Sequence, residues 1–122
     1  MRYKPGQIVF AEYGGFDNEI RKGLFLVLYS ETDDTTTENQ KNYIVVKVTS
    51  QLVDTTYVVK LSTKYNEFLQ KDCYVACSKV HTFNYTQITG LLGEIDNNSL
   101  KKVFKCWCKF NYELERQCLE RI

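Results

Sequence analysis

Two almost uninterrupted apolar runs constrain the fold of this 122-residue chain more than any other feature. The first is LFLVLYS at residues 24–30, and the second is YIVVKV at residues 43–48. Each has the length of a β-strand and consists mainly of aliphatic and aromatic residues. Because neither run offers a continuous polar side to water, both are predicted to be central strands covered on both faces of a sheet.

Turn-forming and polar residues delimit further strands. QIVFAEYGG is preceded by a Pro-Gly pair and ends in a Gly-Gly pair, which marks it as a strand between turns. Two more strands are predicted at residues 55–62 and 73–83. Residues 16–23 and 31–42 are charged or polar and are predicted to be loops.

Helices are predicted in two places. Tyr65, Phe68 and Leu69 have helical spacing, which indicates one short mid-chain helix, while residues 84–95 combine a turn with a short helix or strand. A longer helix is predicted at residues 98–121, capped by Asn98 or Ser99. Its apolar stripe recurs at steps of three and four and would pack on the domain, and partly on a partner. The stripe consists of Leu100, Val103, Phe104, Trp107, Phe110 or Asn111, Leu114 and Cys118.

The elements sum to one domain over residues 1–122 of the mostly β (α+β) class, with a mainly antiparallel sheet. The formal charge of +1 excludes a chain that coats nucleic acid by bulk charge, although a local basic groove remains open. No apolar run is long enough to cross a bilayer, and MRYKPGQIVF lacks the apolar centre of a signal peptide. A cytoplasmic protein is therefore expected.

Five cysteines offer two interpretations. CYVAC followed by His81, with CWC further on, suggests a zinc site. Metal-binding cysteine pairs usually lie on tight turns, however, and CYVACSKV is predicted to be a strand. Reduced, buried or partly buried thiols are therefore favoured, and no metal or cofactor is expected.

The second apolar run ends abruptly in Thr49, Ser50 and Gln51. Three uncharged hydrogen-bonding side chains at a strand end have two interpretations. They either satisfy backbone groups of a turn or form the floor of a binding site. The residues alone leave both open.

In order and spacing, these landmarks resemble the MazF/PemK family of toxins over about residues 3–105. KPGQIVFAEY is similar to the opening of the family, although Gln7 replaces a frequent acidic residue. KGLFLVLYS occupies the place of an Arg-Pro pair and a strand, with Lys22-Gly23 in place of Arg-Pro. VVKVTSQ resembles the third strand, which ends in Thr or Ser and then Gln. KYNEFLQKDCYVACSKVHTFNYTQI resembles the remaining landmarks, with Cys73 for Ser and His81-Thr82 for Arg-Thr.

The resemblance implies a small SH3-like or CcdB-like β-barrel with a short mid-chain helix and a C-terminal helix. It also implies a homodimer, an antitoxin protein as partner, and metal-independent endoribonuclease activity on single-stranded RNA. Some proteins of similar fold, such as CcdB, act on gyrase and cut nothing. The alternative is therefore a diverged, non-catalytic member that binds and inhibits a protein such as gyrase or another nucleic-acid enzyme, carried by a mobile element. A purely structural β domain is a third interpretation.

Metal-free RNA cleavage needs a fixed cation, hydrogen-bond donors to the phosphoryl oxygens and a proton-exchanging group. The resemblance assigns the cation to Lys22, or to Arg21 if the loop shifts by one residue, and the hydroxyl groups to Thr49 and Ser50. His81, the only histidine, is the candidate acid or base. Each residue also has a structural interpretation: a solvated turn pair, a strand end or a hydrogen-bonded histidine.

Candidate RNA-binding residues surround this catalytic set. Tyr13 and Phe16 flank the glycine turn and either stack on unpaired bases or pack back onto the sheet. Glu19 orients Arg21, repels RNA or is simply solvated. Gln51 and Thr82 complete the set, with turn or cap roles as the alternatives. The nuclease hypothesis requires that the charged turn before the second strand bend over the hydroxyl-bearing end of the third.

Overall fold

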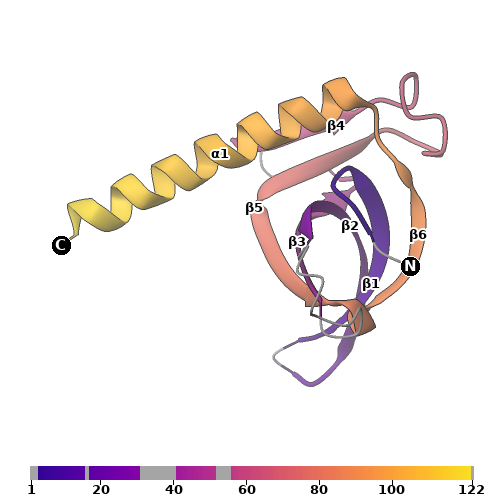
Figure 1. Ribbon diagram of the computed structural model, residues 1–122, viewed down its shortest axis with the longest axis horizontal. Helices are drawn as coiled ribbons and strands as arrows, with labels where there is room; N and C mark the ends of the chain where they lie inside the picture. Colours follow the sequence, from indigo (N-terminus) through magenta and orange to yellow (C-terminus); the bar gives the residue numbers. More distant parts are fainter. Residues whose placement is uncertain (1–2, 16, 31–40, 52–55, 122) are drawn as a thin grey trace.

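The computed structural model describes residues 3–15, 17–30, 41–51 and 56–121. These residues form a sheet of six strands, a short 3₁₀ helix and a C-terminal α-helix (Figure 1). The elements are β1 (Gln7–Gly14), β2 (Ile20–Ser30), β3 (Asn42–Thr49), β4 (Val58–Leu61), β5 (Cys73–Asn84), η2 (Tyr85–Gln87), β6 (Ile88–Glu94) and α1 (Asn97–Glu120).

The sheet has the strand order β4-β5-β3-β2-β1-β6, and every neighbouring pair is antiparallel. It curls strongly, as Figure 1 shows, because irregularities in register interrupt three of the strand pairs. In the described residues β4 and β6 remain edges that do not pair with each other. The mostly β class is confirmed, with an open, curled sheet in place of a closed barrel.

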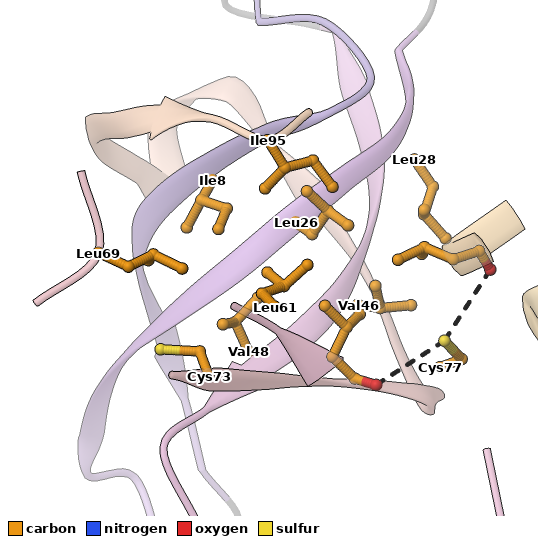
Figure 2. Packing of buried hydrophobic residues seen from close by; sticks show 12 residues of the cluster. Ile8, Leu26, Leu28, Val46, Val48, Leu61, Leu69, Cys73, Cys77 and Ile95 are labelled. Atoms are coloured by element: carbon orange, nitrogen blue, oxygen red, sulfur yellow. Dashed lines mark hydrogen bonds between the residues drawn. The ribbon is translucent and has the colours of Figure 1, made fainter. Parts of the chain in front are cut away.

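The two apolar runs form the adjacent strands β2 and β3 and are covered on both faces, as predicted. Leu26 and Leu28 belong to the cluster beneath α1, which Figure 2 shows at close range. Phe25 and Val27 alternate with them and belong to a second cluster on the opposite face, with Tyr43 among its members. Leu26 and Val27 are both fully buried. Burying both faces of one strand stabilises the centre of the sheet through the hydrophobic effect.

Helix α1 matches the predicted C-terminal helix within one residue at each end. Its cap is Asp96, rather than Asn98 or Ser99, and a carboxylate oxygen of Asp96 accepts a hydrogen bond from the Ser99 backbone N–H at 3.1 Å. The apolar stripe packs on the sheet through Val103 and continues to Phe110, whose ring contacts Tyr57. Beyond that point the helix projects past the sheet, and the last members of the stripe, Leu114 and Cys118, are exposed (Figure 1).

The predicted mid-chain helix is wrong. Residues 62–72 form a series of turns between β4 and β5. Buried Asn66 explains the difference, because its amide donates to the Ser62 carbonyl at 3.1 Å and accepts from the Asp96 N–H at 3.0 Å. Such side-chain to backbone hydrogen bonds compete with helical ones. The segment is thereby tied to the start of α1.

Residues 84–95, predicted as a turn with a helix or strand, contain both η2 and the edge strand β6. Asn84 caps η2 by accepting from the Thr86 N–H, and the Gln87 side chain accepts from the Asn84 N–H. No helix in the described part of the chain is both long and apolar enough to span a membrane.

Candidate active site

Arg21 and Lys22 belong to strand β2, so the prediction of a charged loop over residues 16–23 is wrong for its second half. In the antiparallel register, Arg21 lies opposite Tyr13 and Lys22 lies opposite Glu12. Because side chains alternate along a strand, the two cations project from opposite faces of the sheet. The loop is short because the hairpin pairing continues to Gly14 and Ile20.

Arg21 borders an open hollow of about 330 Å³ that it shares with His81. The remaining residues of its lining are Tyr13, Gly14 and Gly15. The hollow thus joins the β1–β2 hairpin to the far half of β5. Two sequence-predicted catalytic residues and one predicted RNA-binding residue meet there.

Aromatic rings hold His81 on this face. The centre of its imidazole lies 5.5 Å from the ring of Tyr13, 5.3 Å from Phe25 and 5.4 Å from Phe83. Pairing of His81 with Val45 fixes the backbone beneath the ring. The imidazole therefore forms part of an aromatic cluster yet still borders the hollow.

The surroundings of His81 favour its neutral form. Partial burial, followed by the positive charges of Lys47 and Lys79, holds the pKa of His81 below its usual range. At neutral pH the imidazole therefore has a lone pair available to accept a proton.

Arg21 is joined by an acidic residue that the sequence interpretation did not single out. Its Nη2 atom lies 3.7 Å from Oδ2 of Asp17, and both side chains are about half exposed. Glu19, for which an orienting role was one of the alternatives, contributes its backbone carbonyl, which accepts from the Gly15 N–H at 2.9 Å. Asp17 therefore occupies the orienting position proposed for Glu19.

The hydroxyl-bearing end of β3 does not line the hollow, so the hollow is not formed by the charged turn bending over this strand end, as the nuclease hypothesis required. Lys47 pairs with Phe25, so Thr49, two residues further on, projects from the same face as Arg21. Its Oγ1 accepts a hydrogen bond from the Gln51 N–H at 3.2 Å, which is the turn role foreseen for it. Ser50 and Gln51 follow in an exposed bend.

Two further candidates complete the predicted set. Thr82 is an exposed residue of β5 and, being adjacent to His81, projects from the other face. Phe16 lies outside the described residues. The structure thus brings Arg21, His81 and Tyr13 together and leaves Lys22 and Thr82 on the opposite side of the sheet.

The environments of the cysteines range from buried to exposed, with Cys106 intermediate. Cys73 and Cys77 are buried on β5, and the Sγ atom of Cys77 lies 3.9 Å from the Val103 carbonyl of α1 (Figure 2). Burial raises the pKa of the Cys77 thiol, with the neighbouring Cys106 adding to the effect. Cys108 and Cys118 are exposed, and all five are free thiols. Within the described ranges no three His, Cys, Asp or Glu side chains gather as metal ligands would.

Sequence reasoning missed Lys47, Lys79 and Asp17. A signal for Lys47 was present, because it is the one charged residue inside the second apolar run and must project from one face of a buried strand. Asp17 gave no comparable signal, since charged residues in polar segments are usually solvated, and Lys79 gave none because it follows a serine in a predicted strand of mixed polarity.

No protein-family model and no curated protein sequence matches this chain. Solved structures, in contrast, match almost its whole length. A mycobacterial endoribonuclease in complex with its cognate antitoxin has a TM-score of 0.69 and 15% identity over 89% of this chain and 94% of its own. A MazE–MazF complex from Deinococcus radiodurans has a TM-score of 0.67 and 16% identity over 93% and 96%. The Mycobacterium tuberculosis toxin MazF-mt6 has a TM-score of 0.63 and 14% identity over 85% and 94%. This chain therefore has the fold of the MazF toxins.

Proposed function

We propose that this protein is a metal-independent endoribonuclease that cleaves single-stranded RNA. The observation that carries the proposal is the meeting of Arg21 and His81 at one open hollow in a chain with the MazF fold. A permanent cation and a proton acceptor are two of the groups that cleavage by an internal 2′-hydroxyl requires. The fold is shared with solved endoribonuclease structures, and the hollow contains a cation and a proton acceptor.

In the proposed reaction the ribose 2′-oxygen attacks the adjacent phosphorus while the bond from phosphorus to the 5′-oxygen breaks. The neutral imidazole of His81 accepts the 2′-hydroxyl proton. A proton from His81 or from water then reaches the departing 5′-oxygen, which leaves a 2′,3′-cyclic phosphate and a 5′-hydroxyl. Arg21 stabilises the additional negative charge on the phosphoryl oxygens, for which a guanidinium is well suited.

Charge around the hollow supports RNA as the substrate. Lys47 and Lys79 are close enough to His81 to lower its pKa, so they also raise the positive potential where a phosphate would approach. The chain as a whole carries only +1. A local excess of positive charge on this face, which Asp17 offsets in part at Arg21, therefore fits a short phosphodiester segment better than a long duplex.

Tyr13 offers a surface for a base beside the phosphate site. Its ring packs edge-on against Phe25, 5.7 Å between centres, and still borders the hollow. A single-stranded nucleotide would place its base on such a ring and its phosphate at Arg21. Recognition by stacking requires an unpaired base, which is why single-stranded RNA is proposed.

The proposal extends to partners and location. Complexes with an antitoxin exist among the structural neighbours, and we propose an antitoxin as a partner of this chain, which would hold it inactive. The projecting end of α1 exposes Tyr112, Leu114 and Leu119, which a second copy would cover in a homodimer. Cellular RNA as substrate implies action in the cytoplasm.

The test compares two adjacent cations on opposite faces. Purified protein is incubated with an unstructured RNA in EDTA, and cleavage is followed on a sequencing gel with the ends of the products identified. We expect cleavage by the wild-type protein, loss of cleavage in Arg21→Ala, and retention in Lys22→Ala. Intact RNA with folded protein, together with a stoichiometric protein in a pull-down, would instead support the non-catalytic binding alternative.

A further inference from the structure

The hairpin between β1 and β2 holds the guanidinium of Arg21 in a defined place. The Gly15 N–H donates to the Glu19 carbonyl at 2.9 Å, and the Asn18 N–H donates to the Gly15 carbonyl at 3.2 Å. Asn18 adopts a positive φ of 61°, which closes the turn tightly. The two ends of the turn, Gly15 and Glu19, are therefore held together, and Arg21 follows directly in β2, where it pairs with Tyr13 of β1.

Gly15 provides the surface on which the guanidinium lies. A Cβ atom at this position would lie 2.6 Å from Nε and 3.2 Å from Cζ of Arg21, and 2.9 Å from Oδ1 of Asp17. These distances are shorter than van der Waals contact. Any side chain at residue 15 would therefore displace the ion pair, whereas glycine lets it rest on the backbone.

Asp17 fixes the far side of the same group. Its Oδ1 accepts a hydrogen bond from the Glu19 N–H at 3.3 Å, while its Oδ2 lies 3.7 Å from Nη2 of Arg21. The carboxylate thus links the turn backbone to the guanidinium. Because both side chains are about half exposed, the pair contributes little to folding stability, and its effect falls on the position of Arg21.

We infer that Gly15 and Asp17 are positioning residues that hold Arg21 at the hollow it shares with His81. The catalytic consequence rests on the proposed nuclease function, whereas the positioning itself does not. An arginine side chain has several rotatable bonds, and fixing it in advance removes the need to order it when the phosphate arrives. Losing the contact would reduce kcat more than it raises KM.

The structure offers a sharp pair of variants. Gly15→Ala introduces a methyl group against the end of a flexible side chain, so it should displace Arg21 while the hairpin persists. Gly14→Ala introduces the same methyl group one residue earlier, where no atom lies within 4 Å. Asp17→Asn keeps the Oδ1 acceptor of the turn and removes the charge that faces Arg21.

The first readout is independent of catalysis. In nitrogen-15 NMR spectra the Nε–H signal of Arg21 is identified by its loss in Arg21→Lys. We expect Gly15→Ala and Asp17→Asn to shift this signal and Gly14→Ala to leave it in place, with unchanged thermal midpoints. An Arg21 signal that is unaffected by Gly15→Ala would overturn the inference, whether or not the protein cleaves RNA.

The second readout is cleavage. Gly15→Ala should lower kcat by about 100-fold, the effect of a misplacement of about 1 Å. In the Arg21→Ala background Gly15→Ala should have no additional effect, because the group that it displaces is already gone. If the wild-type protein cleaves RNA and Gly15→Ala lowers kcat equally in the wild-type and Arg21→Ala backgrounds, the positioning role is rejected and the nuclease function is retained. A protein that cleaves no RNA but shows the NMR shifts would reject the nuclease and keep the positioning role.

Discussion

The two faces of the β1–β2 hairpin carry adjacent cations in contrasting surroundings. On the face of α1, Lys22 borders a hollow of about 410 Å³ with Phe10, Leu24 and Thr89, and its Nζ lies 3.5 Å from the carboxylate of Glu12. On the other face, Arg21 borders a smaller hollow beside the only histidine. Both cations have an acidic neighbour, and Glu12 lines the hollow of Lys22, but only the hollow of Arg21 contains a histidine. The chemistry available to each cation therefore depends on the side chains that other strands place in its hollow, in particular His81 of β5, and not on the cation alone.

The strongest test of this contrast is removal of each cation in turn. Arg21→Ala should reduce kcat/KM for RNA cleavage by about 10³-fold, because stabilisation of the phosphoryl oxygens is lost. Lys22→Ala should stay within about twofold of wild type, as expected for an exposed ion pair of small energy. Matched melting curves establish that both variants are folded. A reversed order of effects would move the active site to the face of α1.

The second test concerns the proton acceptor. His81→Asn should reduce kcat by about 10²-fold, the lower end of general base effects, because water can reach the open hollow and replace the imidazole in part. The same variant should abolish the acid limb of the pH profile. A residual rate with the wild-type pH dependence would exclude His81 as the base.

The pH profile gives a third test, in which the sign of the effect is fixed. The imidazole must be neutral to accept a proton, so cleavage should fall as pH decreases through the pKa of His81. Burial, Lys47 and Lys79 lower this pKa, and the midpoint of the acid limb should therefore lie below the ordinary value of about 6.5. A proton NMR titration of the single histidine gives the pKa of the free protein, which the acid limb of kcat/KM also reports. A midpoint above 6.5 in both measurements would contradict the described surroundings.

A smaller effect is expected from the lysines that surround His81. Lys47→Ala should move the acid midpoint upward, because removing a neighbouring positive charge makes protonation of the imidazole easier. It should also raise KM about twofold to fivefold at low salt, the usual range for one exposed charge. Added salt should diminish this difference through screening. A KM change that is independent of salt would indicate lost packing rather than lost charge.

How far the sequence predicted this arrangement depends on the range of the interactions involved. The apolar runs of β2 and β3 and the stripe of α1 are local patterns, so their secondary structure could be predicted, as could the burial of the two runs. The mid-chain segment could not, because its turns depend on Asn66 bonding to Asp96, thirty residues away in the chain. Tertiary hydrogen bonds of this kind override local spacing.

The candidate site shows the same difference between local patterns, which the sequence reveals, and long-range contacts, which it does not. His81 and Arg21 were candidates because of their chemistry. Residues 16–23 were predicted to be a loop, however, and side chains of a loop do not alternate between two faces of a sheet, so the sequence could not assign Arg21 and Lys22 to opposite faces. The antiparallel register, which pairs Arg21 with Tyr13, places Arg21 rather than Lys22 on the face of His81. The roles of Asp17 and Gly15 depend on their contacts with the Arg21 guanidinium, whose position no local sequence pattern specifies.

The smallest effect is expected at Thr49, which shares a face with Arg21 but does not line its hollow. Its Oγ1 accepts from the Gln51 N–H in an exposed bend, where water can take over the hydrogen bond. Thr49→Ala should therefore cost about 0.5 kcal/mol of folding stability, at the low end for a hydrogen bond, and change cleavage by less than about twofold. Melting curves and initial rates measure the two effects separately, and growth on induced expression gives a cellular readout at equal protein levels. A large loss of cleavage in Thr49→Ala, restored in Thr49→Ser, would show that the hydroxyl reaches the phosphate and that the hollow extends to the end of β3 when RNA binds.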